Sequence, residues 1–106
     1  MDSIFIYITC KDKQEALDVG KALLSKKLVA CINIIEGMTS AYWWEGEIVE
    51  DTETILIAKS KSNLIDSITE TVKTEHSYDI PCVIGLPIQS GNQAYLNWIS
   101  ESVDAA

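Results

Sequence analysis

The sequence predicts an α+β fold, and three observations lead to this prediction. Runs rich in β-branched residues alternate with longer segments whose apolar residues recur every three or four positions. Two of the β-runs follow one another directly, joined by a Gly-containing turn. A further helical pattern follows the last β-run. The order of elements is therefore β-α-β-β-α-β with a C-terminal helix, within a single domain over residues 1–106.

The first strand and the first helix have clear signals in the sequence. Ser3–Thr9 is almost entirely apolar or β-branched, which predicts a central strand buried on both faces. Asp12, followed three residues later by Glu15, forms a capping-box-like helix start. Helical spacing of apolar residues then predicts a helix over 12–27, with Lys26-Lys27 in its last turn.

A long β-hairpin follows. Its arms, Ala30–Trp44 and Glu47–Ala58, are rich in Ile, Thr, Val and aromatic residues. A two-residue loop at Glu45-Gly46, where glycine supplies a positive φ, places Trp44 opposite Glu47 and Tyr42 opposite Val49. The hairpin register is thereby predicted along with its turn.

The hairpin is too long for a domain of this size. Its first arm is interrupted at Glu36-Gly37, which predicts a bulge or bend. Arms of a dozen residues would span roughly 40 Å at about 3.3 Å per residue, whereas a compact chain of this length has a radius of gyration near 13 Å. One subunit therefore cannot cover its own apolar hairpin, and we expect a neighbouring copy to cover it.

The second half of the chain predicts a helix, an edge strand and a final helix. Ser62 is the expected N-cap of a helix that ends near His76. Ser77–Pro81 is a connector, and Cys82–Pro87 is a short edge strand because Pro87 cannot donate a ladder hydrogen bond. The final amphipathic helix needs a docking surface for its apolar residues Tyr95, Leu96, Trp98, Ile99 and Val103.

This order of elements predicts a ferredoxin-like sandwich, the split-βαβ arrangement, with a long hairpin between its second and third strands. The right-handed crossover rule then brings several segments to one end of the domain. These are Cys10, the hairpin tip (Trp44, Glu45 and Glu47), the end of the second helix (Glu75 and His76), the connector (Tyr78 and Asp79) and Cys82. Cys31 is expected at the opposite end.

Composition and charge exclude several classes of function. The chain has a formal net charge of −8, and all eight basic residues are lysines. The lack of arginine argues against nucleic-acid binding and against a phosphate clamp. Three cysteines without a CxxC pair indicate a reducing compartment, and no secretory or membrane-spanning segment is evident, so we expect a cytoplasmic protein with no membrane partner.

The chemistry-bearing residues do not form an enzyme signature. With one histidine, no nucleophile elbow and no Gly-rich phosphate loop, neither a catalytic triad nor a nucleotide site can be assembled. An acylphosphatase-like site would need an arginine, and an RNA-recognition sheet would need aromatics where the second hairpin arm is acidic. We therefore expect a binding protein and not an enzyme.

Three separated stretches of the chain read ACINIIEGMTSAYWWEGEIVEDTE, KTEHSYDIP and LPIQSGNQAYLNWI. Together they resemble the CutA family of small proteins named for divalent-cation tolerance, and the resemblance covers roughly Ile4 to Ile99. It implies a ferredoxin-like subunit and a tight homotrimer in which the long hairpins pair with neighbouring sheets. It also implies a structural likeness to the PII signalling proteins.

The resemblance implies candidate site residues as well. The family's proposed copper site uses a cysteine at the end of the first strand, here Cys10, and two consecutive histidines at the end of the second helix, here Glu75 and His76. These positions imply a metal site for Cu(II) or another divalent cation. The family's aromatic cluster corresponds to Tyr42 and Trp44 on the hairpin and to Tyr78 and Pro81 after the second helix.

Each of these residues also has a structural interpretation. Cys10 is equally a small buried hydrophobe, and His76 is favoured by the helix dipole at a helix C-terminus. Adjacent residues on a helix point about 100° apart, so Glu75 and His76 can both be ligands only if the helix frays there. The aromatic residues are also typical of a packed subunit interface.

Three functions follow from these interpretations. The first is a cytoplasmic homotrimer involved in divalent metal ion tolerance, or the response to metal ions, that binds copper. The second is a PII-like signalling module that binds a small ligand in the cleft between subunits. The third is a trimeric scaffold whose partners are other proteins.

Overall fold

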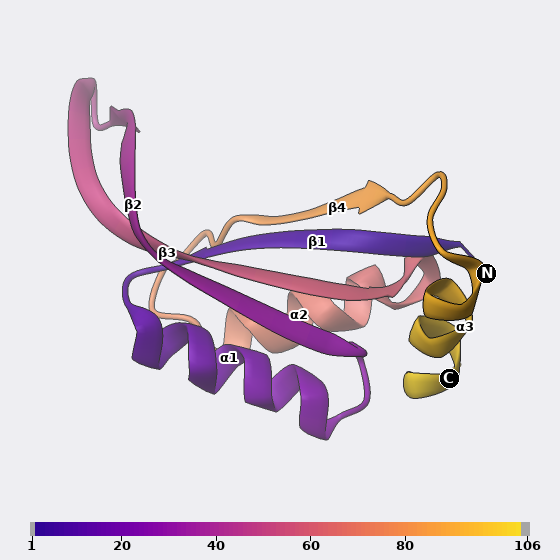
Figure 1. Ribbon diagram of the computed structural model, residues 1–106. Helices are drawn as coiled ribbons and strands as arrows, with labels where there is room; N and C mark the ends of the chain where they lie inside the picture. The colour runs from indigo at the N-terminus through magenta and orange to yellow at the C-terminus, as the bar shows by residue number, and fades with distance from the viewer. Residues whose placement is uncertain (1, 105–106) are drawn as a thin grey trace.

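The computed structural model describes residues 2–104, and its elements follow the predicted order. They are β1 (Ser3–Cys10), α1 (Lys13–Ser25), β2 (Cys31–Trp44), β3 (Glu47–Lys61), the 3-10 turn η1 (Ser62–Leu64), α2 (Ile65–Glu75), β4 (Val83–Pro87) and α3 (Gln93–Ser102). The four strands form one sheet in the order β2-β3-β1-β4, and every neighbouring pair is antiparallel. The predicted ferredoxin-like α+β fold is confirmed (Figure 1).

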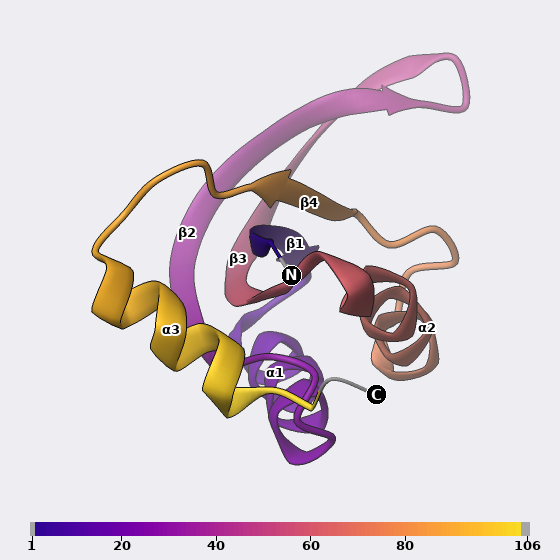
Figure 2. The ribbon, with the colours of Figure 1, turned by 90° about the vertical axis from the view of Figure 1, so that its right-hand side faces the viewer.

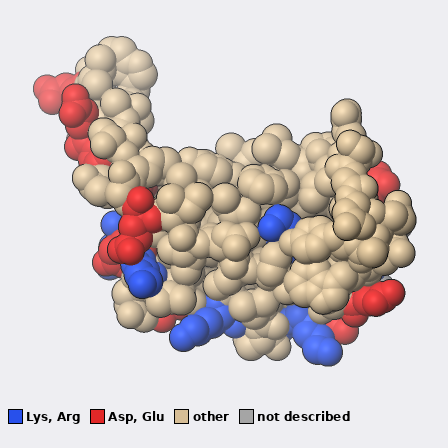
Figure 3. All heavy atoms as spheres, viewed as in Figure 1, with Lys and Arg blue, Asp and Glu red and all other residues tan. Residues whose placement is uncertain are grey.

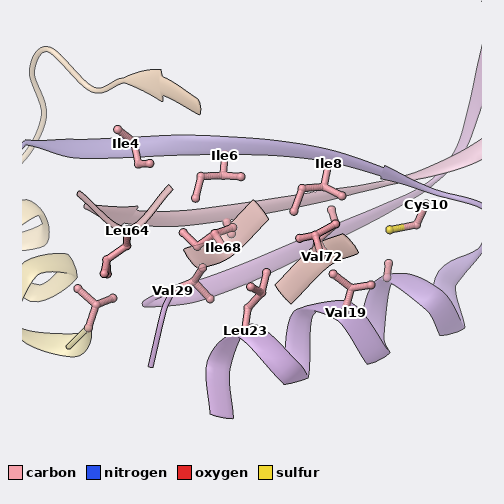
Figure 4. Close-up of a cluster of buried hydrophobic side chains, with 14 residues drawn as sticks. Ile4, Ile6, Ile8, Cys10, Val19, Leu23, Val29, Leu64, Ile68 and Val72 are labelled. Carbon is pink, nitrogen blue, oxygen red and sulfur yellow. The ribbon is translucent and has the colours of Figure 1, made fainter. Parts of the chain in front are cut away.

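The core lies between the sheet and the two long helices. Alternate residues of β1, from Ile4 through Ile6 and Ile8 to Cys10, point toward α1 and α2 and are buried (Figure 4). Of the residues between them, Thr9 is also buried, but Phe5 and Tyr7 are only half-buried. The prediction that this strand is buried on both faces is therefore wrong for a single copy, because α1 and α2 cover only one face of the sheet.

The hairpin has the predicted turn and register. Glu45 and Gly46 both have positive φ, 50° and 81°, as a type I′ turn requires. Trp44 pairs with Glu47 and Tyr42 with Val49, and the ladder is shifted between Ile35 and Met38, where Gly37 has a φ of 80°. The predicted bulge is therefore confirmed. β3 runs three residues further than expected, to Lys61, because β1 pairs with it along its full length.

The outer half of the hairpin projects beyond the rest of the domain (Figures 1 and 2). β1 ends at Cys10, opposite Thr54, so within residues 2–104 no third strand supports the hairpin beyond that point. The molecule measures 44 × 26 × 22 Å as a result. Large apolar side chains on the projection are exposed: Trp43 by 73%, Trp44 by 58% and Ile48 by 66%.

Two helix boundaries differ from the prediction. Asp12 caps α1 as expected, but the helix ends at Ser25, so Lys26-Lys27 lies beyond its last turn. Lys27 adopts a positive φ of 55° and closes the helix. Ser62 does not cap α2: it opens the 3-10 turn, and α2 begins at Ile65 without a side-chain cap.

α3 lies against the end of the sheet opposite the hairpin tip (Figure 2). Asn92 caps this helix by accepting a hydrogen bond from the Ala94 N–H. Ile99 and Val103 are buried, but Tyr95 and Trp98 remain about two-fifths exposed, at 40% and 42%. No helix in residues 2–104 is long and apolar enough to cross a membrane.

Candidate metal centre

Three buried donor groups meet at the end of the domain from which the hairpin projects. They are the Cys10 thiol, the Glu15 carboxylate and the His76 imidazole, and one ligand atom from each lies within 4.8 Å of the others. Cys10 ends β1, Glu15 lies in the first turn of α1 and His76 is the C-cap residue of α2. Three separate elements therefore supply the group.

The start of α1 turns Glu15 toward Cys10. Asp12 accepts a hydrogen bond from the Glu15 N–H at 2.8 Å, which fixes the first turn. The Glu15 carboxylate reaches back one residue further than a standard capping box, because Oε1 accepts from the Lys11 N–H at 3.0 Å. Its other oxygen accepts from the Ser77 N–H at 3.0 Å. Glu15 thus joins the start of α1 to the end of α2.

These donors keep Glu15 ionised although it is buried. Burial raises the pKa of the carboxyl group, but hydrogen bonds from Ser77 and Lys11 outweigh that effect and leave the pKa below its ordinary value. Only 7% of the residue is exposed, so its charge lies almost entirely inside the protein. A buried negative charge is thus fixed next to the other two groups.

Both nitrogens of the His76 ring are hydrogen-bonded. The Tyr78 N–H donates to Nδ1 at 3.0 Å, so Nδ1 carries a lone pair and the ring proton sits on Nε2. That Nε2–H donates to the Thr9 carbonyl oxygen at 2.7 Å. Nε2 also lies 3.5 Å from Glu15 Oε1. The hydrogen bonds therefore define the neutral Nε2–H tautomer.

The Cys10 thiol is fully buried among carboxylates. Burial, together with Glu15, Asp12 and Glu53, raises the pKa of this thiol to about 12. The group is therefore a thiol at neutral pH. A divalent cation bound beside it would offset the negative field and favour the thiolate, which is the ligand form.

A second set of contacts extends the network to the base of the hairpin. The Tyr78 hydroxyl donates to Glu53 Oε2 at 2.9 Å, and the Tyr78 ring meets the His76 ring edge-on with centroids 4.6 Å apart. Burial and the Glu53 carboxylate raise the pKa of the Tyr78 hydroxyl well above its ordinary value. Glu53 sits on β3 opposite Met38, next to the bulge. Tyr78 therefore links the donor group to the hairpin.

The structure brings together two of the three metal-site residues implied by the sequence. Cys10 and His76 are in the group, whereas Glu75 is exposed at the end of α2 and Glu15 supplies the carboxylate instead. Glu15 was identified from the sequence only as a helix-capping residue. Its position in the donor group was not predicted. Glu15 could have been found from its position five residues after Cys10, across a tight strand-to-helix turn.

The four aromatic-cluster residues fall into two places within one chain. Tyr78 and Pro81 lie on the connector after α2, while Tyr42 and Trp44 lie on the projecting hairpin. Tyr42 pairs with Val49, four residues beyond Glu53, which is about 13 Å along the strand at roughly 3.3 Å per residue. Tyr42 and Tyr78 nevertheless lie near the same carboxylates, since Asp51 and Glu53 act on both hydroxyl groups.

The donor set suits a borderline cation. Thiolate and imidazole ligands favour copper or zinc, and the carboxylate adds charge. Each donor is engaged by hydrogen bonds or protonated, so a cation would have to replace the Nε2–H hydrogen bond of His76 and the thiol proton of Cys10. Both are exchanges that metal ligands ordinarily undergo.

The sequence of the chain matches one protein family and its curated members. Residues 4–102 match the family described as CutA1 divalent ion tolerance protein. The chain is 45% identical to the rice protein CutA 1, chloroplastic, over 94% of its own length and 56% of that protein. It is 40% identical to the divalent-cation tolerance protein CutA of Thermus thermophilus, over 92% of its length and 94% of that protein.

Solved structures agree with these sequence matches. The crystal structure of CutA1 from Oryza sativa superimposes with a TM-score of 0.96 at 42% identity, covering 100% of this chain and 97% of that chain. The Thermus thermophilus protein superimposes with a TM-score of 0.94 at 38% identity, covering 96% and 99%. The chain thus spans little more than half of the rice protein's sequence but nearly all of the Thermus protein.

Proposed function

The chain belongs to the CutA1 divalent ion tolerance family, and from this premise we propose that it is a cytoplasmic homotrimer that binds a divalent cation, with copper(II) favoured. The observation that carries this proposal is the convergence of a thiol, an imidazole and a carboxylate within 4.8 Å. Copper(II) is favoured because N/S donor sets follow the Irving–Williams order. The protein acts in this proposal as a binding protein and not as an enzyme.

The proposed ligands are Cys10, His76 and Glu15, with Glu75 as an auxiliary. Glu75 borders a surface depression of about 360 Å³ that Glu15 and His76 also line. An exposed carboxylate there attracts cations toward the buried donors, which lie behind it. The depression therefore supplies an entry path.

Cation binding at this group must release protons. Cys10 enters the site as a thiol whose pKa lies near 12 and must lose its proton to act as a ligand. Affinity therefore rises with pH over the range in which that proton competes with the cation. In buffers of different ionisation enthalpy, calorimetry should detect the released proton, and its absence would argue against thiolate ligation.

Assembly into a homotrimer is supported by apolar surface that one copy leaves uncovered. On the sheet face away from α1 and α2, Ile35, Ile84 and Leu86 are each about half exposed, at 51%, 49% and 50%. The projecting hairpin adds Trp43, Trp44 and Ile48. A soluble chain rarely leaves patches of this kind open, and closed symmetry covers them most simply.

Calorimetric titration with copper(II) tests the site. We expect Cys10→Ala and His76→Ala each to weaken copper binding at least tenfold, because each removes a ligand atom. Cys31→Ala is the matched control, since Cys31 opens β2 at the other end of the domain and should leave affinity unchanged. Unchanged affinity in both test variants would remove the proposed site.

The exposed hairpin aromatics favour a second candidate, a small-ligand site between copies. In this proposal Tyr42 and Trp44 of one copy meet Tyr78 and Pro81 of another, which accounts for their separation within one chain. A screen of metabolites by thermal shift tests it, because a ligand that binds only the folded trimer raises Tm. The rise in Tm must persist when a chelator is present. If the chelator abolishes it, binding at the metal site is sufficient to explain the rise.

A further inference from the structure

We propose that the cation and the Ser77–Pro81 connector compete for His76, so that cation binding releases the connector from the domain. This inference rests on the proposed function, because it assumes a cation at the Cys10, Glu15 and His76 group. It adds a regulatory consequence: occupancy of the site is transmitted to the base of the hairpin.

The first step is the tautomer of His76. Its Nδ1 accepts the Tyr78 N–H at 3.0 Å, and its Nε2–H donates to the Thr9 carbonyl at 2.7 Å. Nε2 is the nitrogen next to the Glu15 carboxylate, since it lies 3.5 Å from Glu15 Oε1. The nitrogen aimed at the site therefore carries the proton, and the nitrogen with the lone pair holds the connector.

The second step is what ligation requires. A cation needs the lone pair of Nε2, so the proton on Nε2 must move to Nδ1 while the ring stays neutral. Nδ1–H then faces the Tyr78 N–H, and two donors would oppose each other at 3.0 Å. The Tyr78 N–H bond to the ring therefore breaks when His76 becomes a ligand through Nε2.

The third step concerns the remaining contacts of the connector. The Ser77 N–H donates to Glu15 Oε2, and Glu15 is itself a proposed ligand. The Tyr78 hydroxyl donates to Glu53, which is only 7% exposed at the hairpin base. Two of these three hydrogen bonds thus depend on groups that the cation would take, and the Tyr78–Glu53 bond alone would resist release.

Tyr78 is therefore a positioning residue for the cation site. Its hydroxyl holds the connector in place, so removing it should ease release and strengthen cation binding. Glu53 is the other partner in this bond. Release would also free the Glu53 carboxylate at the point where β3 leaves the support of β1.

Zinc(II) titration of the 106-residue chain tests the inference by calorimetry and NMR, because zinc is diamagnetic. We expect Tyr78→Phe to raise zinc affinity about tenfold, the worth of one hydrogen bond to a charged group. Tyr95→Phe, which alters a tyrosine on α3, is the matched control and should leave affinity unchanged.

The wild-type spectra provide a readout that a purely structural role for Tyr78 would not move. On zinc binding, the Tyr78 amide should lose its protection from hydrogen exchange, and the His76 ring ¹⁵N shifts should report transfer of the proton to Nδ1. Zinc binding with a protected Tyr78 amide and unchanged affinity in Tyr78→Phe would overturn the inference and leave the proposed function intact. Absence of zinc binding to the wild type would overturn the inference, and absence of copper(II) binding as well would overturn the proposed function.

Discussion

The buried Cys10 thiol makes the stability of the metal-free protein depend on pH. Its pKa is about 12 in the folded chain, against an ordinary value of 9.0. The unfolded chain therefore releases this proton near pH 9 while the folded chain keeps it to about pH 12. Unfolding is coupled to proton release between those values, so stability falls as pH rises.

Comparison of wild type with Cys10→Ala should reveal this effect. The free energy of unfolding of wild type should fall, relative to the variant, by about 1–2 kcal/mol between pH 8 and pH 10.5. Urea denaturation in the presence of chelator measures the difference at fixed protein concentration. Parallel pH profiles for the two proteins would contradict the assigned burial of this thiol.

Glu15 gives the opposite pH dependence. Because its folded pKa lies below the ordinary value, its contribution to stability is present above that value and is lost as pH falls through the folded pKa. Glu15→Gln should destabilise the metal-free protein by about 1–3 kcal/mol at pH 7, since an amide cannot accept from Lys11 and Ser77 as the carboxylate does.

Glu75→Gln is the matched control for Glu15→Gln. Glu75 is exposed, and we expect its substitution to change stability by less than about 0.5 kcal/mol. Chemical denaturation of both variants at pH 7 and pH 4 gives the comparison. If Glu15→Gln loses no more stability than Glu75→Gln, the carboxylate does not tie α1 to the end of α2.

Residue identities allowed only part of the donor group to be predicted. The meeting of Cys10 and His76 follows from topology, because β1 and α2 both end on the same side of the domain. Glu15 could not be selected in the same way, because an acidic residue three positions after an N-cap already has a local role. The choice between Glu15 and Glu75 depends on the direction of each side chain.

At the scale of elements, α1 ends in a Schellman arrangement built without glycine. The Leu28 N–H donates to the Leu23 carbonyl and the Lys27 N–H to the Leu24 carbonyl, each at 3.0 Å. Lys27 occupies the position with positive φ, 55°, where glycine is favoured. This explains why the predicted helix end was late: the stop depends on a conformation that lysine rarely adopts.

Lys27→Gly should therefore stabilise the protein. Relief of the left-handed conformation is worth about 1–2 kcal/mol, and the added flexibility of glycine in the unfolded chain offsets about half of it. Lys26→Gly is the control and should be destabilising, because Lys26 has an ordinary φ of −87°. Thermal denaturation of both variants tests the pair, and equal shifts would contradict the assignment.

The turn and register of the hairpin were predictable, but the start of the helix that follows it was not. Glu45-Gly46 specifies a type I′ turn, and that turn fixes the register of every pair down to the bulge. By contrast, Ser62 looked like a helix cap because serine favours that position, yet the chain passes first through a 3-10 turn. The conformational preference of a residue therefore determines the local structure only where no tertiary contact competes with it.

For the whole molecule, apolar and acidic surfaces meet on the same projection. Figure 3 shows acidic side chains along one side of the hairpin and uncharged atoms over much of the rest. The exposed carboxylates are those of Glu45, Glu47, Glu50 and Asp51. Charges along a free edge discourage open-ended strand pairing, so they favour a closed assembly over a fibre.

The central claim is that sister copies cover the hairpin and the helix-free face of the sheet. Sedimentation equilibrium at low micromolar concentration tests it most directly. We predict a single species with three times the 11.7 kDa mass of the chain, and Trp43→Glu should shift it toward smaller species by burying a charge in the interface. A well-folded species of 11.7 kDa for the wild type would contradict the claim.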